Sequence, residues 1–291
     1  MLDKFKIGNY TDNENCTGVT VILCEEGAVA GGSVQGAAPA TRETDLLRTD
    51  KTVQKINAVT LSGGSAFGLE AACGVMEYLR QKDCGYDTGK FRVPIVVSAS
   101  LYDLEYGNFS FPDKQAGFEA ALNARAGNFE KGNIGAGTGA TVGKIFKMKG
   151  AMKAGLGYSL HKEGDLEIAV ISAVNALGDI IDENGKIIAG TKLGKFFAGS
   201  AKYYNLYAKT LKKQNTTISC IITNAKLNKK EANDIAEIAH KGYDMAISPS
   251  HTVFDGDAIF CMASGEIKCQ IDRLTALIPD LVAKAVRSVF Y

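Results

Sequence analysis

The sequence predicts a single α/β domain. Short β-branched segments alternate along the chain with longer segments whose apolar residues recur at helical spacing. Hydrophobic residues make up 46% of the 291 residues and charged residues 22%, which is typical of a globular protein with a sizeable core. Only residues 190–215 resemble a connector, so we expect strands from both halves to share one core.

Strands are expected where short apolar runs end at glycine, proline or polar clusters. These runs are residues 18–25, 57–61, 93–98, 151–160, 166–176, 217–223 and 257–263. The segment 28–42 is rich in Gly and Ala and is expected to be a loop or an irregular strand.

Helices are expected where the apolar spacing changes to three and four residues. Ser65 is a candidate N-cap for the first helix. Asn228, followed three residues later by Glu231, has the pattern of a capping box. Pro279 should interrupt the last helix. The expected helices are residues 65–82, 113–124, 203–212, 228–241 and 267–290.

Composition argues against several classes of partner. A net charge of +1 without runs of like charge gives no reason to expect nucleic acid or a membrane surface as a partner. No uninterrupted apolar stretch approaches the length of a membrane span, and the N-terminus has no signal-peptide core. Seven Cys without a C-x-x-C pattern predict reduced thiols and a cytoplasmic protein. The three His share no ligand spacing, so neither a metal nor another cofactor is expected.

The pair Asn215-Thr216 opens an apolar strand-type segment, which is one arrangement that lets a chain cut its own backbone. The hydroxyl of Thr216 can attack the carbonyl of Asn215, and hydrolysis of the resulting ester frees the α-amino group of Thr216. An unperturbed α-amino group has a pKa of about 7.7–8.0 and can act as general base for the hydroxyl beside it. The alternative is an ordinary turn before a strand, because Asn favours turns.

The glycine-rich segment 132–144 does not match a nucleotide-binding loop. A Walker loop needs Gly where Thr138 stands and Ser or Thr where Ile145 stands. A tight turn is therefore the favoured interpretation. Lys144 would leave this turn as a fixed positive charge, which can stabilise an oxyanion or lower the pKa of an amine.

Other polar residues stand at the ends of expected strands. Each has an ordinary alternative: a helix cap for Ser65, an aromatic packing residue for Tyr102, and turns for Asn175 and for the Asp pair. In the functional interpretations, the loop before residue 67 binds an anion or the substrate. The Asn175 amide donates to an oxyanion, and the Asp pair accepts a proton. The residues concerned are Gly64, Ser65, Phe67, Tyr102, Asn175, Asp255 and Asp257.

Seven segments in order give the chain a family likeness. They are GVTVILCEEGAVAGG, GAAPATRETDLLR, LSGGSAFGLEAACGVMEYL, GAGTGATVGK, SAVNALGD, NTTISCIITNA and FDGDAIF. Over roughly residues 15–265 the chain resembles the L-aminopeptidase/D-esterase family of self-cleaving hydrolases, which includes β-aminopeptidases and nylon-oligomer hydrolases.

The resemblance implies a four-layer αββα sandwich, similar to N-terminal-nucleophile hydrolases but with distinct connectivity. It implies a cut at Asn215/Thr216 into an α chain, residues 1–215, and a β chain, residues 216–291, with Thr216 as nucleophile. A cut one residue later, before Thr217, stays open. By the same likeness Tyr102, Lys144 and Asn175 match catalytic or oxyanion-stabilising positions, and Asp255 and Asp257 match the acidic pair of the nylon-hydrolase-like members.

The expected function is therefore hydrolysis of the amide bond of small peptides or peptide-like amides. By likeness, the αβ units should assemble into a homo-oligomer. Two alternatives stay open. One is an N-terminal-Thr acyltransferase of the ornithine acetyltransferase type, and the other is an unprocessed, non-catalytic binding protein on the same fold.

Overall fold

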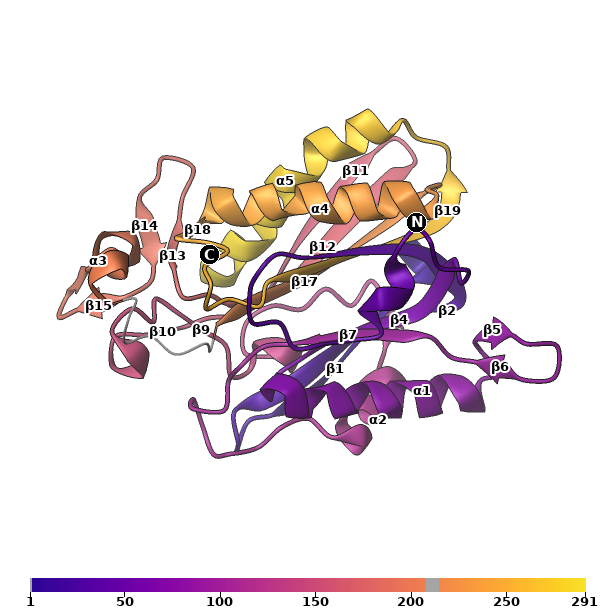
Figure 1. The fold of residues 1–291 in the computed structure, drawn as a ribbon, viewed down its shortest axis with the longest axis horizontal. Coiled ribbons are helices and arrows are strands. Elements are labelled where there is room, and N and C mark those ends of the chain that lie inside the picture. The colour runs from indigo at the N-terminus through magenta and orange to yellow at the C-terminus, as the bar shows by residue number, and fades with distance from the viewer. Residues whose placement is uncertain (1, 208–214) are drawn as a thin grey trace.

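The computed structural model describes residues 2–207 and 215–291 (Figure 1). A ten-stranded sheet forms the centre of the molecule, in the order β11-β12-β17-β19-β2-β4-β7-β3, with β1 added beside β2 and β8 beside β1. Its strands are β1 Lys6–Asp12, β2 Thr17–Val34, β3 Thr41–Arg42, β4 Lys55–Ser62, β7 Val96–Ser100, β8 Arg125–Ala126, β11 Gly155–Glu163, β12 Leu166–Asn175, β17 Thr216–Ala225 and β19 Ala258–Ile267.

Five helices and several two-residue or three-residue strands complete the described part of the chain. The helices are α1 Ala71–Gln81, α2 Lys114–Leu122, α3 Ser200–Tyr207, α4 Lys229–Ala246 and α5 Ile271–Arg287. The small strands are β5 Tyr86–Asp87, β6 Arg92–Val93, β9 Thr141–Val142, β10 Met152–Lys153, β13 Asp179–Ile181, β14 Ile187–Ala189, β15 Lys192–Leu193, β16 Phe196–Phe197 and β18 Ile247–Ser248.

Strand β2 belongs to both halves of the sheet. Its first part, 17–23, pairs with β1 and β4, and its last part, 29–34, pairs with β19. The register with β4 shifts between Leu23 and Ala28, where Gly27 has a left-handed φ of 78°. This irregularity lets the long strand change direction, so that the sheet folds into two layers.

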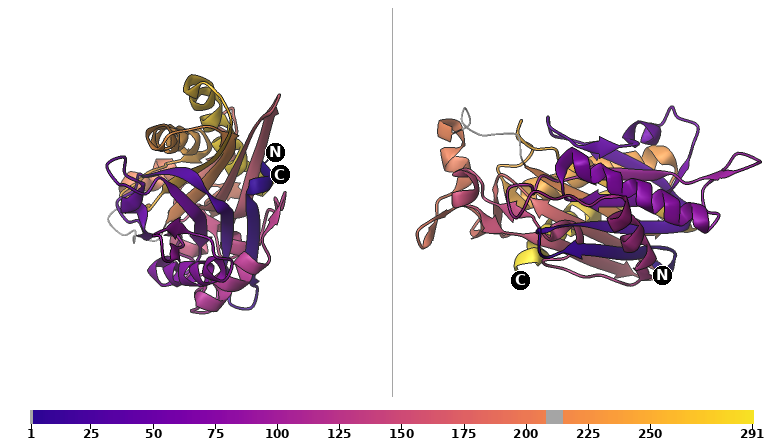
Figure 2. Two further views of the ribbon diagram at one scale, coloured as in Figure 1. Left: turned by 90° about the vertical axis from the view of Figure 1, so that its right-hand side faces the viewer. Right: turned by 90° about the horizontal axis from the view of Figure 1, so that it is seen from below.

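Two pairs of helices cover the sheet layers (Figures 1 and 2). Helix α4 packs on β2 and β19, and α5 packs on β11 and β12. On the opposite side, α1 packs on β4 and β7, and α2 packs on β1 and β2. The order helix pair, sheet, sheet, helix pair confirms the predicted αββα sandwich, and strands from both halves of the chain share its main core.

Of the two interpretations given for residues 28–42, loop or irregular strand, the strand holds for the first part, which continues β2 to Val34 after the register shift. The glycines there serve close packing. A Cβ atom on Gly31 would lie 2.2 Å from the backbone nitrogen of Asn233, so the missing side chain lets α4 approach the strand. The glycine-rich composition of this part therefore marks a strand beneath a helix.

Two helix predictions also need correction. Residues 65–82 form a 3-10 segment, Ser65–Glu70, followed by α1, and Ser65 lies inside that segment with a φ of 54° and no capping hydrogen bond. Helix α5 continues through Pro279 without a break. It packs so closely on α4 that a Cβ atom on Gly242 would lie 2.4 Å from the Pro279 carbonyl oxygen, and this contact supports the helix through the proline.

The predicted capping box of α4 is confirmed. The Glu231 N–H donates to Asn228 Oδ1 at 2.9 Å, and the Asn228 N–H donates to Glu231 Oε2 at 2.8 Å. The helix expected over 203–212 begins earlier, as α3, and residues 208–212 lie outside the described part of the chain.

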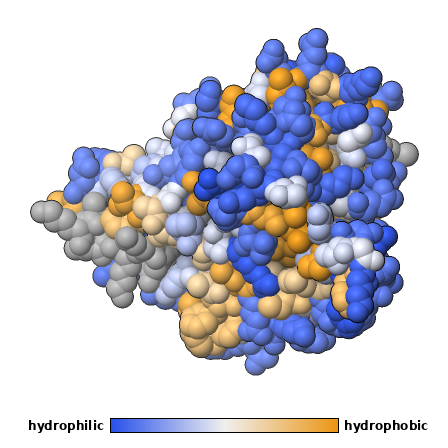
Figure 3. Space-filling view, turned by 45° about the vertical axis from the view of Figure 1, so that its right-hand side comes forward, coloured by the Kyte–Doolittle hydropathy of each residue, from blue (hydrophilic) through white to orange (hydrophobic). Residues whose placement is uncertain are grey.

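Within the described residues, none of the helices is long and apolar enough to span a bilayer. The face in Figure 3 is mostly hydrophilic, with apolar side chains in patches between the polar ones. Residues 179–207, with β13 to β16 and α3, extend from one end of the sandwich (Figure 1).

Candidate active site

The bond between Asn215 and Thr216 lies at the start of β17, inside the sheet. Thr216 is the register partner of Asn175 on β12, and Asn215 forms a parallel bridge with Asp255 just before β19. Only 3% of Asn215 and 4% of Thr216 is exposed. The sheet therefore buries this peptide bond and brings two other predicted site residues, Asn175 and Asp255, beside it.

Two donors converge on the carbonyl oxygen of Asn215. The Gly256 N–H donates to it at 3.0 Å, and the Thr216 hydroxyl donates to it as well. Thr217 differs: alternation along a strand turns its side chain to the other face, and its buried Oγ1 has no hydrogen-bond partner among the described residues. Of the two threonine hydroxyls, it is therefore that of Thr216 that contacts the Asn215 carbonyl group.

Lys144, Asn175 and Tyr102 are brought together beside this bond. The Lys144 ammonium donates to the backbone oxygen of Asn175 at 2.9 Å and to its Oδ1 at 2.7 Å. The Thr141 N–H donates to the same Oδ1 at 3.0 Å, and Asn175 Nδ2 donates to the backbone oxygen of Tyr102 at 2.9 Å. Asn175 therefore joins the glycine-rich segment and the Tyr102 loop to β12.

The glycine-rich segment 132–144 contains a 3-10 turn, Gly135–Gly137, and the short strand β9 rather than a single tight turn, and Lys144 follows it into the interior. Gly143 has a φ of 69°, and a Cβ atom there would lie 2.0 Å from the backbone nitrogen of Thr191. Burial disfavours the charged ammonium and lowers the pKa of Lys144 to about 7, although the negative charge of Asp255 opposes this shift.

Asp255 and Asp257 approach the bond from the loop before β19. The Thr217 N–H donates to Asp257 Oδ1 at 2.7 Å, and both the N–H and the hydroxyl of Thr252 donate to Asp255 Oδ2, at 2.8 and 2.6 Å. Burial and the nearby charge of Asp257 raise the pKa of Asp255 to about 7. One of the two carboxyl groups can therefore carry a proton at neutral pH.

The structure places three further residues here that were not selected from the sequence. Asp103 accepts from the Gly64 N–H at 2.7 Å and from the Thr17 hydroxyl at 2.9 Å, and burial raises its pKa to about 6. His251 lies 2.9 Å from Asp257, and Thr252 holds Asp255. Only the short spacing of His251 and Thr252 before the Asp pair could have drawn attention to them.

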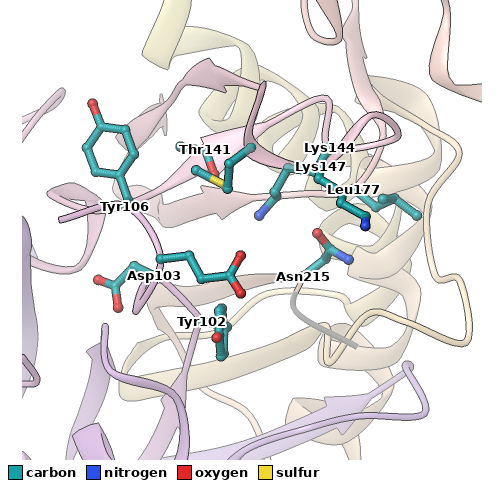
Figure 4. Close-up of a pocket in the computed structure, with 10 residues that line it drawn as sticks. Tyr102, Asp103, Tyr106, Thr141, Lys144, Lys147, Leu177 and Asn215 are labelled. Atoms are coloured by element: carbon teal, nitrogen blue, oxygen red, sulfur yellow. The ribbon is translucent and has the colours of Figure 1, made fainter. Parts of the chain in front are cut away.

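A pocket opens beside the Asn215 end of the bond (Figure 4). Tyr102 and Asp103 lie on one side, with Lys144 and Asn215 across from them. The pocket is lined by Tyr102, Asp103, Glu105, Tyr106, Thr141, Lys144, Lys147, Met148, Leu177 and Asn215. A substrate in this pocket would lie next to Lys144 and the start of β17.

Gly64, Ser65 and Phe67, predicted to bind substrate, do not line this pocket. The N–H groups of Gly64 and Ser65 already donate to Asp103 Oδ1 and to the Leu101 carbonyl. Phe67 is 54% exposed and stacks on Phe111. These three residues support the neighbouring Tyr102 loop from behind.

Among residues 2–207 and 215–291, no three His, Cys, Asp or Glu side chains come together as metal ligands. The polar groups around the bond between Asn215 and Thr216 are instead a hydroxyl, an ammonium, two carboxyl groups and backbone N–H donors. This set suits acyl transfer, in which a nucleophile attacks a carbonyl and donors hold the developing oxyanion.

Comparison with known sequences places this arrangement among hydrolases. Residues 4–290 match peptidase family S58. An uncharacterized aminopeptidase of Mycobacterium leprae is 34% identical over 266 residues, which cover 86% of this chain and 72% of the relative. A 6-aminohexanoate-oligomer endohydrolase of Kocuria sp. is 31% identical over 269 residues, covering 90% of this chain and 73% of that enzyme.

Solved structures share the fold. The L-aminopeptidase D-Ala-esterase/amidase of Ochrobactrum anthropi, described as a variant of the Ntn hydrolase fold, superposes with a TM-score of 0.74 at 16% identity, over 99% of this chain and 84% of that one. A Burkholderia sp. β-aminopeptidase gives a TM-score of 0.71 at 15% identity, over 98% and 82%.

Proposed function

Since this chain belongs to peptidase family S58, a family of aminopeptidases and amide hydrolases, we propose that it cuts itself between Asn215 and Thr216 and then hydrolyses amides with Thr216. The observation that carries the proposal is that the Thr216 hydroxyl and the Gly256 N–H both donate hydrogen bonds to the Asn215 carbonyl oxygen. Family membership favours hydrolysis over acyl transfer to an amine acceptor.

Self-cleavage begins when Thr216 Oγ1 attacks the carbonyl carbon of Asn215. The Gly256 N–H stabilises the negative charge that develops on the carbonyl oxygen. The C–N bond then breaks, the proton from the hydroxyl passes to the leaving nitrogen, and an ester joins Asn215 to Oγ1. Water hydrolyses this ester and leaves a carboxyl group on Asn215 and a free amine and hydroxyl on Thr216.

Turnover repeats this chemistry on a substrate. The Thr216 amine takes the proton from Oγ1, which forms a C–O bond to the substrate carbonyl. The substrate C–N bond breaks, and the leaving amine takes up that proton. Water then hydrolyses the acyl ester. The amine exists only after the cut, so an uncleaved chain should have negligible activity.

The surrounding residues have distinct parts in this proposal. Lys144 places a positive charge beside the reacting carbonyl and, through Asn175, fixes the wall of the pocket. Asp257 holds the Thr217 N–H, and with Asp255 it offers carboxyl groups to the new ammonium of Thr216. The backbone oxygen of Tyr102 keeps the Asn175 amide oriented.

The proposed substrates are small peptides or peptide-like amides, because the relatives are named as aminopeptidases and as endohydrolases of 6-aminohexanoate oligomers. The two products of the cut, 1–215 and 216–291, should stay together, since β17 and β19 are central strands of the same sheet as β2. We further propose that these αβ units form a homo-oligomer in the cytoplasm.

Substitution of the nucleophile tests the proposal. Thr216→Ala should give an intact, folded chain that hydrolyses none of a panel of α-amino, β-amino and D-residue amides and 6-aminohexanoate oligomers. The wild-type protein, assayed beside it, should be cleaved and should hydrolyse at least one member of the panel. A Thr216→Ala protein that is cleaved or active would refute the assignment.

A further inference from the structure

A two-residue segment, His251-Thr252, contacts both carboxyl groups of the site. Thr252 donates two hydrogen bonds to Asp255 Oδ2. His251 Nδ1 lies 2.9 Å from Asp257 Oδ2 in an ion-pair contact that lacks the alignment of a hydrogen bond, while the other oxygen of Asp257 accepts from the Thr217 N–H. A continuous chain of contacts thus runs from His251 through Asp257 to the residue that follows Thr216.

The backbone of His251 is strained in a way that serves this contact. Its φ of 48° lies in the left-handed region, which glycine adopts freely and only a few per cent of other residues adopt, Asn, Asp and His among them. A residue kept in this conformation carries a cost that the surrounding structure must offset, and such residues cluster at functional sites. The strain places the imidazole against Asp257.

The surroundings of the imidazole favour its charged form. Burial opposes the charge, since the His251 side chain is only 17% exposed, but the contact with Asp257 outweighs burial and raises the pKa of His251. Asp244 adds to this effect, with Oδ1 3.9 Å from Nε2. The rings of His240 and Tyr243 lie 4.8 and 5.8 Å away; burial lowers the pKa of His240 to about 4 and keeps it neutral.

We infer that His251 is a positioning residue that fixes the Asp257 carboxyl group in the orientation that holds the Thr217 N–H, and so fixes Thr216 against the carbonyl that it attacks. The inference rests on the proposed function. Without the imidazole, Asp257 is free to rotate away from Thr217, and the first residues of β17 lose a charged acceptor. Misplacement of a reacting group by about 1 Å can cost on the order of 100-fold in rate.

Two substitutions separate this role from a structural one. His251→Gly removes the imidazole and keeps the left-handed backbone accessible, and its free energy of unfolding is measured beside its activity so that any loss of stability is known. His251→Asn also tolerates this backbone, and its side-chain N–H stands close to the position of Nδ1. The matched control is His161→Asn, on a half-buried histidine 3.7 Å from Glu163 at the edge of the sheet.

In His251→Gly, the rate of self-cleavage should be lower than in the wild type by roughly 10- to 100-fold. The rate of amide hydrolysis, kcat, should fall similarly while KM changes little, because the pocket is untouched. His251→Asn should recover part of both rates but lose the dependence on pH that the titrating imidazole gives. Wild-type rates in His251→Gly, or equal losses in His251→Gly and His161→Asn, would overturn the inference.

A second measurement tests the contact without relying on activity. The pKa of the His251 imidazole is followed by NMR in Thr216→Ala protein, with and without Asp257→Asn. The pKa should lie above the ordinary value of about 6.5 and should fall when Asp257 loses its charge. An unchanged pKa would overturn the inference even if the chain proved not to cleave itself, whereas an uncleaved wild-type chain with the expected pKa values would contradict only the proposed function.

Discussion

The backbone N–H of Gly256 donates to the carbonyl oxygen of Asn215 at 3.0 Å. These residues are far apart in sequence, and the parallel pairing of β17 with β19 brings them together. A donor in this place polarises the carbonyl before any substrate arrives. Under the proposed mechanism, a cut that moves Asn215 away would make the same N–H available to the carbonyl oxygen of a substrate.

The choice between Thr216 and Thr217 can be tested with isosteric variants. Thr216→Val should abolish self-cleavage, because the hydroxyl that engages the Asn215 carbonyl is gone. Thr217→Val should still be cleaved. It should be equally or more stable, since the hydroxyl it removes is buried without a partner among the described residues. Gel electrophoresis of freshly purified proteins distinguishes the two; cleavage of Thr216→Val and arrest of Thr217→Val would move the nucleophile by one residue.

Lys144 should matter to rate far more than to stability. Its ammonium is buried with a pKa of about 7, so the fold already opposes its charge, and Lys144→Met should change the free energy of unfolding by only about 1 kcal/mol. Loss of the positive charge beside the carbonyl should slow self-cleavage by roughly 100- to 1,000-fold. The control is Lys149→Met, an exposed lysine nearby in the chain. A Lys144→Met chain that cleaves at the wild-type rate would exclude this role.

Asp255 should link stability to pH, and Thr216→Ala protein allows the measurement on a single intact chain. The folded-state pKa of Asp255 is about 7, above the ordinary value of 3.8, so its stabilising contribution is complete below pH 3.8 and is lost as pH rises through 7. Asp255→Asn mimics the protonated form and removes this loss. Between pH 4 and 7 the variant should therefore gain stability relative to its parent by roughly 1 kcal/mol per pH unit.

Urea denaturation at several pH values measures this difference, and groups that titrate equally in both proteins cancel. A constant difference between the two proteins across the range would mean that Asp255 is already ionised in the folded state. A difference with the opposite slope would mean that a cation holds its pKa below the ordinary value.

Local sequence signals predicted the elements that depend on neighbouring residues. The capping pair Asn228 and Glu231 marks the start of α4, and the apolar run after Thr216 marks β17. Asn175 and Lys144 were candidates from their own sequence context, but that they meet in one site was implied only by family likeness, because local spacing says nothing about which segments are neighbours. The antiparallel pairing of β12 with β17 places Asn175 opposite Thr216, and backbone hydrogen bonds from Gly143 and Lys144 to the turn after Asn175 bring Lys144 beside it.

Long-range packing explains what the sequence did not predict. Gly31 belongs to a strand because α4 lies against it, and Pro279 stays helical because α5 is held against Gly242. His251 was passed over as a histidine without ligand spacing; its role depends on a left-handed turn that brings the ring back to Asp257. Such relationships exist only once the layers are assembled.

The central claim is the cut before Thr216, and the mass of the denatured protein tests it most directly. Since 215 of the 291 residues precede the cut in a chain of 30.9 kDa, the account predicts two species of about 23 and 8 kDa. N-terminal sequencing of the smaller should begin at Thr216. A single species of 30.9 kDa after long incubation, or a smaller fragment that begins elsewhere, would contradict the account.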